Sequence, residues 1–361
     1  MLLKPKPLIL EIEPYKPGLS KAKGEKQVIK LSSNETPLGP SQKAVEAYVS
    51  AAKNLYRYPD GSATILREAI GQVHGLDPDK IICGAGSDEI ISFLCHAYAG
   101  KGDEVLYSEH GFLMYPIYAK IAGSTPVQAK EKNLTVDIDS ILEKVNANTK
   151  IVFVANPNNP TGSYVSKNEL LRLRKGLPRD VLLVIDAAYS EYVSEPDYSD
   201  GKELVDMDEN TVMLRTFSKI YGLAALRIGW AYCPRNVADI LNRVRGPFNV
   251  SMPAYLAAAA AVKDVEFVRK AKEYNDYWLP WLAGELSSLG LKVYPSVANF
   301  ILVEFLQGNK NVDKANDYLM ENGIIGRRVA NYGLDNFLRF TIGKDSENQA
   351  LVKSLREFLA L

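Results

Sequence analysis

Short runs of consecutive apolar residues alternate with amphipathic stretches through the middle of the chain. The strand candidates are "KIICGAG", "EVLYSE", "KIVFVANP", "DVLLVIDAAY", "TVMLRTFS" and "IGWAYC", and helical segments such as "SDEIISFLCHAYAG" and "KNELLRLRKGL" lie between them. Runs such as "IVFV" and "VLLVI" are apolar at successive positions, so both faces of these strands are expected to be buried under helices. The pattern predicts an α/β layer architecture around a mostly parallel sheet.

The pattern changes after about residue 246. A long helical region follows, and we expect Pro280 to break it; "KVYPSVANFILVEF" and "NFLRFTIG" then read as strands, with helices at "VDKANDYLMENG" and at the C-terminus. The first residues are rich in lysine and proline and too few for a domain. We therefore predict an N-terminal arm (1–30) that packs on the small domain or on a partner subunit, a large domain (31–246) and a smaller α+β domain (247–361).

Composition excludes several classes of protein. The 361 residues include 43 Lys plus Arg and 43 Asp plus Glu, so no overall field draws nucleic acid or an anionic membrane. No apolar run approaches the ~20 residues of a membrane span. The cysteines and histidines are too scattered for a disulfide framework or a metal site, and each histidine is expected to be a solvated or core residue: Cys83, Cys95, Cys233, His74, His96 and His110. We expect a soluble, cytoplasmic protein without a metal.

Two candidate chemical groups lie at the ends of buried strands. "NPNNPTG" (156–162) follows "KIVFVA", and Asn159 could donate its amide to a ligand, although the segment is also ordinary turn chemistry. Asp186 ends "VLLVID" and is followed by Ala188 and Tyr189. A carboxylate there needs a buried cation or a hydrogen-bond donor, unless it serves as a helix N-cap.

Two further segments offer an anion site and an amine. "GAGSDE" (84–89) joins a strand to a helix and could present free N–H groups to a phosphate, or its acidic residues could simply favour the helix dipole. Lys219 follows "VMLRTFS", and Ser218 and Arg227 flank it. A desolvated lysine there would be a usable nucleophile, although its stem could pack while its ammonium reaches water.

The four features together predict a pyridoxal 5'-phosphate (PLP) site. A lysine supplies the Schiff base, an aspartate holds the pyridine nitrogen protonated, an asparagine lies in a nearby turn, and a glycine- and serine-containing loop holds the phosphate. No single one of them would be sufficient.

The same segments resemble a known family. "NETPLGP", "YRYPDG", "GAGSDE", "NPNNPTG", "DAAY" and "TFSKIYGLAALRIG", in this order along most of the chain, are similar to the fold-type I PLP aminotransferases and within them to the histidinol-phosphate aminotransferase branch. The resemblance implies a seven-stranded, mostly parallel sheet between helices, a small C-terminal domain and an N-terminal arm.

The resemblance also implies roles for individual residues. Lys219 would form the Schiff base and shuttle the proton, Asp186 would pair with the pyridinium nitrogen, and Asn159 and Tyr189 would bind the phenolic oxygen. Phe112 and Ala188 would flank the ring. The cofactor phosphate would lie among four residues of this chain and a tyrosine of the neighbouring subunit in a homodimer with shared active sites: Ser87, Asp88, Ser218, Arg227 and Tyr58.

For the substrate, the resemblance implies two arginines and a covering tyrosine. Arg339 in "FLRFTIG" would bind the anionic group, and Tyr15 in "EPYKPG" would close over the substrate. Arg327 in "GIIGRR" would be the second arginine, with Arg328 as a competitor one position away; both could instead belong to a solvated basic turn. Two arginines suit a dianionic phosphate, because each can donate two hydrogen bonds.

The function expected from this resemblance is transamination of histidinol phosphate with 2-oxoglutarate to imidazole-acetol phosphate and glutamate, a step of histidine biosynthesis. Three alternatives stay open at this point: an aromatic amino-acid aminotransferase, a PLP-dependent decarboxylase of a phosphorylated amino acid, and a PLP-binding regulatory protein. The last would need a DNA-binding module for which the 361 residues leave little room.

Overall fold

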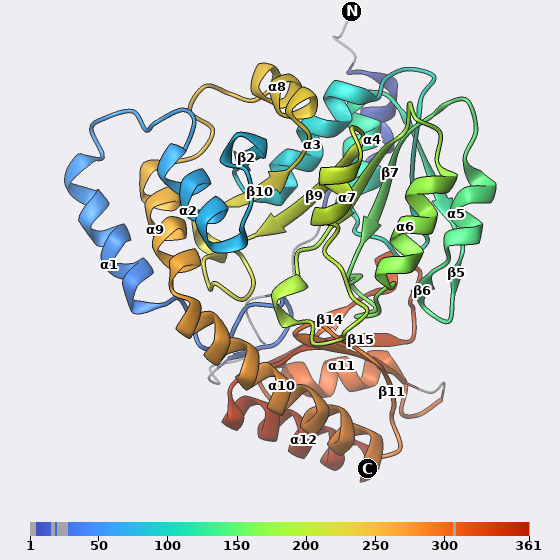
Figure 1. Ribbon diagram of the computed structural model, residues 1–361. Coiled ribbons are helices and arrows are strands. Elements are labelled where there is room, and N and C mark those ends of the chain that lie inside the picture. The colour runs from blue at the N-terminus through green and yellow to red at the C-terminus, as the bar shows by residue number, and fades with distance from the viewer. Residues whose placement is uncertain (1–4, 16–18, 20–27, 306–307, 361) are drawn as a thin grey trace, which may run out of the picture.

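A seven-stranded sheet forms the centre of the molecule in the computed structural model, which describes residues 5–15, 19, 28–305 and 308–360 (Figure 1). Its strand order is β2-β10-β9-β8-β7-β3-β4, and only β10 runs antiparallel to its neighbours. The strands span Ile81–Gly84 (β2), Gly229–Tyr232 (β10), Thr211–Thr216 (β9), Leu182–Asp186 (β8), Thr149–Ala155 (β7), Glu104–Ser108 (β3) and Thr125–Ala129 (β4). The predicted mostly parallel sheet of seven strands is confirmed.

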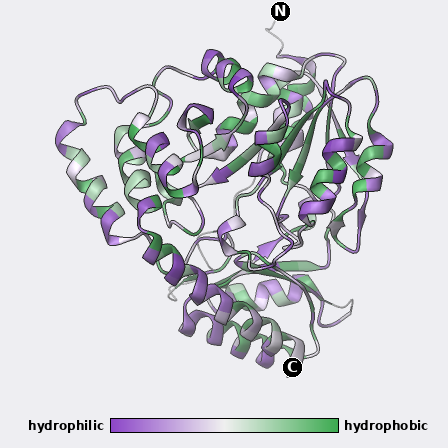
Figure 2. Cartoon of the chain, viewed as in Figure 1, coloured by the Kyte–Doolittle hydropathy of each residue, from purple (hydrophilic) through white to green (hydrophobic). Residues whose placement is uncertain are grey.

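Helices cover both faces of this sheet. Successive residues of the central strands therefore pack in different cores, one on each side of the sheet. Leu182 and Val184 of β8 pack with α3, α4 and α8, whereas Leu183 and Ile185 pack with α5, α6 and α7. Figure 2 shows the central strands mostly in the green of hydrophobic residues. These helices span Ser87–Tyr98 (α3), Met114–Ala122 (α4), Arg235–Val244 (α8), Ile138–Lys144 (α5), Lys167–Gly176 (α6) and Lys202–Met207 (α7).

A third group of helices, α1 (Gln42–Ala51), α2 (Thr64–His74) and α9 (Met252–Lys263), packs beside β9 and β10 in one further core. The alanine-rich α9 contacts α1 and α2 along its length, because its small side chains allow close approach. Although α9 follows the boundary expected at residue 247, it thus packs against helices of the expected large domain.

The helix α10 (Val265–Ser288) leads from α9 into the small domain. The predicted break at Pro280 does not occur, because α10 continues through this proline. The helical region is instead interrupted at Asp264, whose φ of −87° and ψ of 63° lie outside the α region.

The small domain is a four-stranded antiparallel sheet backed by helices. Its strand order is β11-β12-β15-β14, and its core includes side chains from α10, α11 and α12. The elements span Lys292–Tyr294 (β11), Phe300–Glu304 (β12), Phe337–Thr341 (β15), Arg327–Arg328 (β14), Val312–Glu321 (α11) and Asp345–Ala360 (α12).

The described part of the N-terminal arm contacts both domains. The 3-10 helix Pro7–Glu11 lies on α4, where the Lys120 Nζ is 3.5 Å from Glu11 Oε2. Further on, β1 (Ile29–Lys30) pairs in parallel with β13 (Ile324–Ile325) of the small domain. The arm was expected to pack on the small domain or on a partner subunit, whereas the structure also places it against α4 of the large domain. Residues 16–18 and 20–27 lie outside the described residues.

Short elements complete the described fold. They are the hairpin of β5 (Glu131–Lys132) and β6 (Thr135–Val136) and the 3-10 turns Ala52–Asn54, Pro78–Lys80, Ser190–Tyr192, Ala224–Leu226 and Ala330–Tyr332. None of the helices described here is both long and apolar enough to cross a membrane.

Candidate active site

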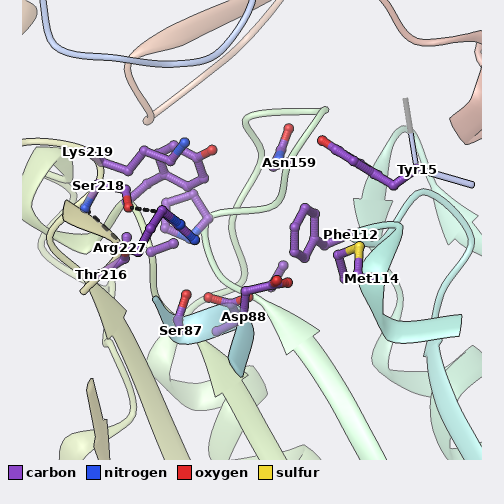
Figure 3. A pocket seen from close by; sticks show the side chains of 15 residues that line it. Tyr15, Ser87, Asp88, Phe112, Met114, Asn159, Thr216, Ser218, Lys219 and Arg227 are labelled. Atoms are coloured by element: carbon purple, nitrogen blue, oxygen red, sulfur yellow. Dashed lines mark hydrogen bonds between the residues drawn. The ribbon is translucent and has the colours of Figure 1, made fainter. Parts of the chain in front are cut away.

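A cavity of about 350 Å³ opens at the carboxyl ends of the parallel strands, where α/β sheets bind ligands. Figure 3 shows Lys219, Ser218 and Arg227 on one side of it and Phe112, Met114 and Tyr15 on the other. Most of the predicted site residues line this cavity: Tyr15, Ser87, Asp88, Phe112, Asn159, Asp186, Ala188, Tyr189, Ser218, Lys219 and Arg227. The topology thus brings together residues that are up to 212 positions apart.

Asp186 ends β8 and is buried at the base of the cavity. Burial raises its pKa to about 6, although hydrogen bonds from Tyr115 and from the Ala188 backbone, and the charge of Lys219, oppose this shift. Its Oδ2 accepts a hydrogen bond from the Tyr115 hydroxyl (2.9 Å), whereas its Oδ1 has no partner among the described residues. A buried carboxylate oxygen without a donor fits the protonated ring nitrogen of a cofactor.

Lys219 lies in the turn after β9 (Thr211–Thr216), and its side chain lines the cavity. The ammonium donates to the Ser33 carbonyl oxygen (3.2 Å) and lies 5.5 Å from the centre of the Tyr189 ring. Among the described residues the ammonium thus contacts a carbonyl oxygen and an aromatic ring but no carboxylate, so no ion pair with these residues has to be broken before the amine reacts.

The Tyr189 hydroxyl accepts a hydrogen bond from Asn34, for which no role was predicted from the sequence. The Asn34 Nδ2 donates to this hydroxyl (2.9 Å), and the Asn34 backbone N–H donates to Thr341 Oγ1 of β15 (2.9 Å). Asn34 has a φ of +57°, which asparagine tolerates better than most residues. It lies in "NETPLGP", so the segment was recognised but the contact was not.

An anion cradle forms where α3 begins. Ser87 is the first residue of α3, and Gly86 before it has a φ of +85°. A Cβ at Gly86 would lie 2.5 Å from the Arg227 Nη2, so glycine is required for the guanidinium to reach this position. Arg227 also donates from Nη1 to Ser218 Oγ (3.2 Å). A cation, two hydroxyls and a helix N-terminus suit a phosphate.

Asp88 differs from the other residues of the cradle because its side chain is a carboxyl group. Burial raises its pKa, and its Oδ2 accepts from the Tyr118 hydroxyl (2.9 Å). Only its backbone N–H, at the start of α3, is therefore suited to an anion.

The walls of the cavity are partly aromatic. Phe112 lies edge-on to Tyr115 (ring centres 5.8 Å apart), and Tyr115 in turn stacks on Phe153 at 4.5 Å. Ala188 lies in the turn after β8 and also lines the cavity. Three further residues of the site were not predicted from the sequence: Tyr115, Met114 and Thr216. The only signal for Tyr115 is its place three positions after Phe112, in the segment "HGFLMY" (110–115).

Arg339 lies in β15 behind Asn159 and is only 5% exposed. Its Nη1 donates to Asn159 Oδ1, its Nη2 donates to the Ser32 carbonyl oxygen (2.9 Å), and its guanidinium lies 5.1 Å from the centre of the Phe300 ring. Burial lowers its pKa from the usual value.

The pairing of β14 with β15 separates the two neighbouring arginines. Arg327 lies directly opposite Arg339, and residues directly opposite in an antiparallel pair share one face of the sheet. Arg328 lies opposite Leu338 on the other face, where its Nη2 pairs with Asp313 Oδ1 of α11 at 3.1 Å. The register therefore places Arg327, and not Arg328, on the face of Arg339.

Tyr58 is not among the residues that line the cavity within one chain. Its side chain is 82% exposed and stacks on Phe248 with ring centres 4.7 Å apart.

Comparisons with known proteins agree with this geometry. The family model described as aminotransferase class I and II matches residues 26–355. The histidinol-phosphate aminotransferase of Paramagnetospirillum magneticum is 56% identical over 98% of both chains, and that of Rhodopseudomonas palustris strain HaA2 is 52% identical over 99% of this chain and 98% of the relative. The crystal structure of the Sinorhizobium meliloti histidinol-phosphate aminotransferase with pyridoxal-5'-phosphate superposes with a TM-score of 0.88 at 25% identity, covering 100% of this chain and 98% of that one.

Proposed function

Because the chain belongs to the aminotransferase class I and II family, we propose that it transaminates histidinol phosphate with 2-oxoglutarate, using PLP. The family match confirms the resemblance found in the sequence. The observation that supports histidinol phosphate as the substrate is the 56% identity, over nearly the whole length of both chains, to a relative named histidinol-phosphate aminotransferase. The products would be imidazole-acetol phosphate and glutamate.

Different residues of the cavity would bind different parts of the cofactor. Asp186 Oδ1 would hold the ring nitrogen, Asn159 and Tyr189 the phenolic oxygen, and Phe112 and Ala188 the two ring faces. Ser87, Ser218, Arg227 and the Asp88 backbone would bind the phosphate. When bound, PLP supplies the electron sink that makes the α-proton of the substrate removable.

Lys219 would perform the proton transfer. Its side chain lines the cavity, and no carboxylate of the described part of the chain pairs with its Nζ, so as a free amine it can accept the α-proton and return it to a neighbouring carbon. Tyr15 lines the cavity at its outer side and would exclude water above the substrate.

The assay that decides the substrate compares kcat/KM for histidinol phosphate, phenylalanine and tyrosine, each with 2-oxoglutarate. We expect histidinol phosphate to be preferred by at least about tenfold, because a buried Arg339 with Arg327 beside it favours a dianion. Preference for phenylalanine or tyrosine would instead identify an aromatic amino-acid aminotransferase.

The register of β14 gives a matched pair of variants. We predict that Arg327→Ala lowers kcat/KM for histidinol phosphate by about 100-fold, because hydrogen bonds to charged groups contribute about 1.5–3 kcal/mol, and that glutamate is affected much less. Arg328→Ala, which removes a group on the opposite face, should change neither value by more than about twofold. Equal losses for both substrates in Arg327→Ala would indicate a structural role.

We also propose a homodimer with shared active sites. Several large apolar side chains are exposed between residues 48 and 58 and at Phe248, which stacks on Tyr58, and exposed apolar side chains are typical of association surfaces: Tyr48, Val49, Leu55, Tyr56 and Phe248. The cytoplasm remains our prediction for its location; all three cysteines are free and buried, as a reducing compartment allows.

A hybrid experiment tests whether sites are shared. We expect Tyr58→Ala to weaken cofactor binding and Lys219→Ala to be inactive, each as a pure protein. When the two are unfolded, mixed and refolded together, one site of each hybrid would combine Lys219 of one chain with Tyr58 of the other. Recovered activity above the sum of the two parents supports sharing, and a mixture as poor as its parents contradicts it.

A further inference from the structure

We propose that His110 is a positioning residue that connects the cofactor-binding turn of the large domain to the arginine-bearing part of the small domain. His110 lies between β3 and α4, and its imidazole is nearly buried at 9% exposure. It does not line the active-site cavity. Its proposed effect on the substrate rests on the function proposed above.

The first contact of His110 is to the small domain. Its Nδ1 lies 2.7 Å from the carbonyl oxygen of Tyr332, the last residue of the 3-10 turn Ala330–Tyr332. A carbonyl oxygen only accepts, so Nδ1 carries the proton and the ring donates. This hydrogen bond joins residues that are 222 positions apart.

The second contact is to the turn that carries Asn159. The backbone carbonyl of His110 accepts from Asn158 Nδ2 (3.3 Å), and the same Nδ2 donates to Thr161 Oγ1 (3.0 Å). The buried Glu131 joins the two segments, because its Oε1 accepts from the His110 backbone N–H (3.2 Å) and lies 3.4 Å from Asn158 Nδ2. His110 therefore holds the residue next to Asn159 and lies two positions before Phe112.

Tyr332, whose carbonyl accepts the hydrogen bond from His110, lies close to the two arginines proposed to bind the substrate. Its ring is buried in a cluster with Leu302, Val329 and Leu334, against which Leu113 of the His110 segment also packs. The turn Ala330–Tyr332 follows β14 (Arg327–Arg328) after one residue, and β14 pairs with β15, where Arg327 lies opposite Arg339. A shift of the Tyr332 turn would therefore displace the surroundings of both arginines.

The test uses a variant that removes only the donor and one that restores it. His110→Leu keeps a branched side chain but cannot donate, whereas His110→Asn retains a donor at the same distance from the backbone. His96→Leu is the matched control, because the His96 Nδ1 makes a similar contact to the Ser92 carbonyl oxygen (2.8 Å) on the exposed side of α3.

With the PLP-loaded enzyme, we expect His110→Leu to raise KM for histidinol phosphate by about three- to tenfold, the value of one hydrogen bond, with kcat changed by less than about threefold. His110→Asn should recover most of this loss, and His96→Leu should match the unmodified protein. In an Arg327→Ala background the effect of His110→Leu should shrink, since residues that act through each other are not additive. Full additivity, a loss confined to kcat, or no rescue by asparagine would overturn the proposal.

Hydrogen exchange of the cofactor-free protein tests the same contact without turnover. The amides of Tyr332 and Gly333 donate within the turn to Val329 and Ala330 at 2.9 Å each. They should exchange several-fold faster in His110→Leu and normally in His96→Leu. Unchanged exchange would refute the connection whatever the substrate is. If histidinol phosphate proves not to be a substrate, the proposed function fails, and exchange together with the KM for glutamate still decides the role of His110.

Discussion

Lys219→Ala should reduce kcat by about four orders of magnitude or more, because the variant loses both the covalent attachment point and the group that moves the α-proton. The cofactor should nevertheless stay bound through Arg227, Ser218 and the start of α3. The measurement pairs steady-state turnover with the absorption spectrum of the purified protein, in which the band of lysine-bound PLP should be absent.

Two further results would distinguish chemistry from folding. Small primary amines should partly restore turnover in Lys219→Ala, because the vacated space can admit a substitute proton acceptor. Lys175→Ala, an exposed lysine of α6, should behave as the unmodified protein. If the unmodified protein never binds PLP, or if Lys219→Ala retains normal turnover, the proposed function is wrong.

Asp186→Asn should lower kcat by about two to three orders of magnitude, because removing one partner of a buried ion pair costs about 3–5 kcal/mol. The cofactor-free protein should respond in the opposite sense. The folded pKa of Asp186 is about 6, above the ordinary 3.8, so the folded state holds the proton more tightly than the unfolded chain. The stability that this proton contributes is complete below about pH 4 and is lost as the pH rises through 6.

Asp186→Asn should therefore raise the melting temperature of the cofactor-free protein by a few degrees at pH 8 and much less at pH 4. A shift of about two pKa units corresponds to roughly 3 kcal/mol, which is an upper value for this gain. Thermal unfolding at the two pH values measures it, with Asp239→Asn on the surface of α8 as the control. A destabilised variant at pH 8 would show that the carboxylate is compensated already without a cofactor.

Much of the large domain follows from local pattern alone. The strands from β7 to β9 are continuous apolar runs, and their carboxyl ends carry Asp186 and Lys219, so both the sheet and the main chemical groups could be predicted. The edge strand β4 was not singled out, because it contains Pro126 and its first four residues are partly or fully exposed. Its alternation is too weak to be distinguished from a loop.

Other parts of the site depend on packing between distant segments. The contact of Tyr115 with Asp186 spans 71 positions, and no spacing rule brings a helix residue beneath that carboxylate. The choice between Arg327 and Arg328 needed the register of β14 on β15, since alternation separates the two side chains but does not say which faces the site. The alanines of α9 are apolar on every side, so their pattern does not reveal which domain they join.

The surroundings of Arg339 have a consequence for discrimination between substrates. Its described contacts are an amide oxygen, a carbonyl oxygen and an aromatic ring, and none of them carries a negative charge. We propose that the counter-ion of this buried cation arrives with the substrate. A neutral amine of the right shape would fill the same space but leave the Arg339 guanidinium without a counter-ion, which is unfavourable in a site that excludes water. Neutral amines would therefore be excluded because the guanidinium would lack a counter-ion, and not because of the size of the cavity.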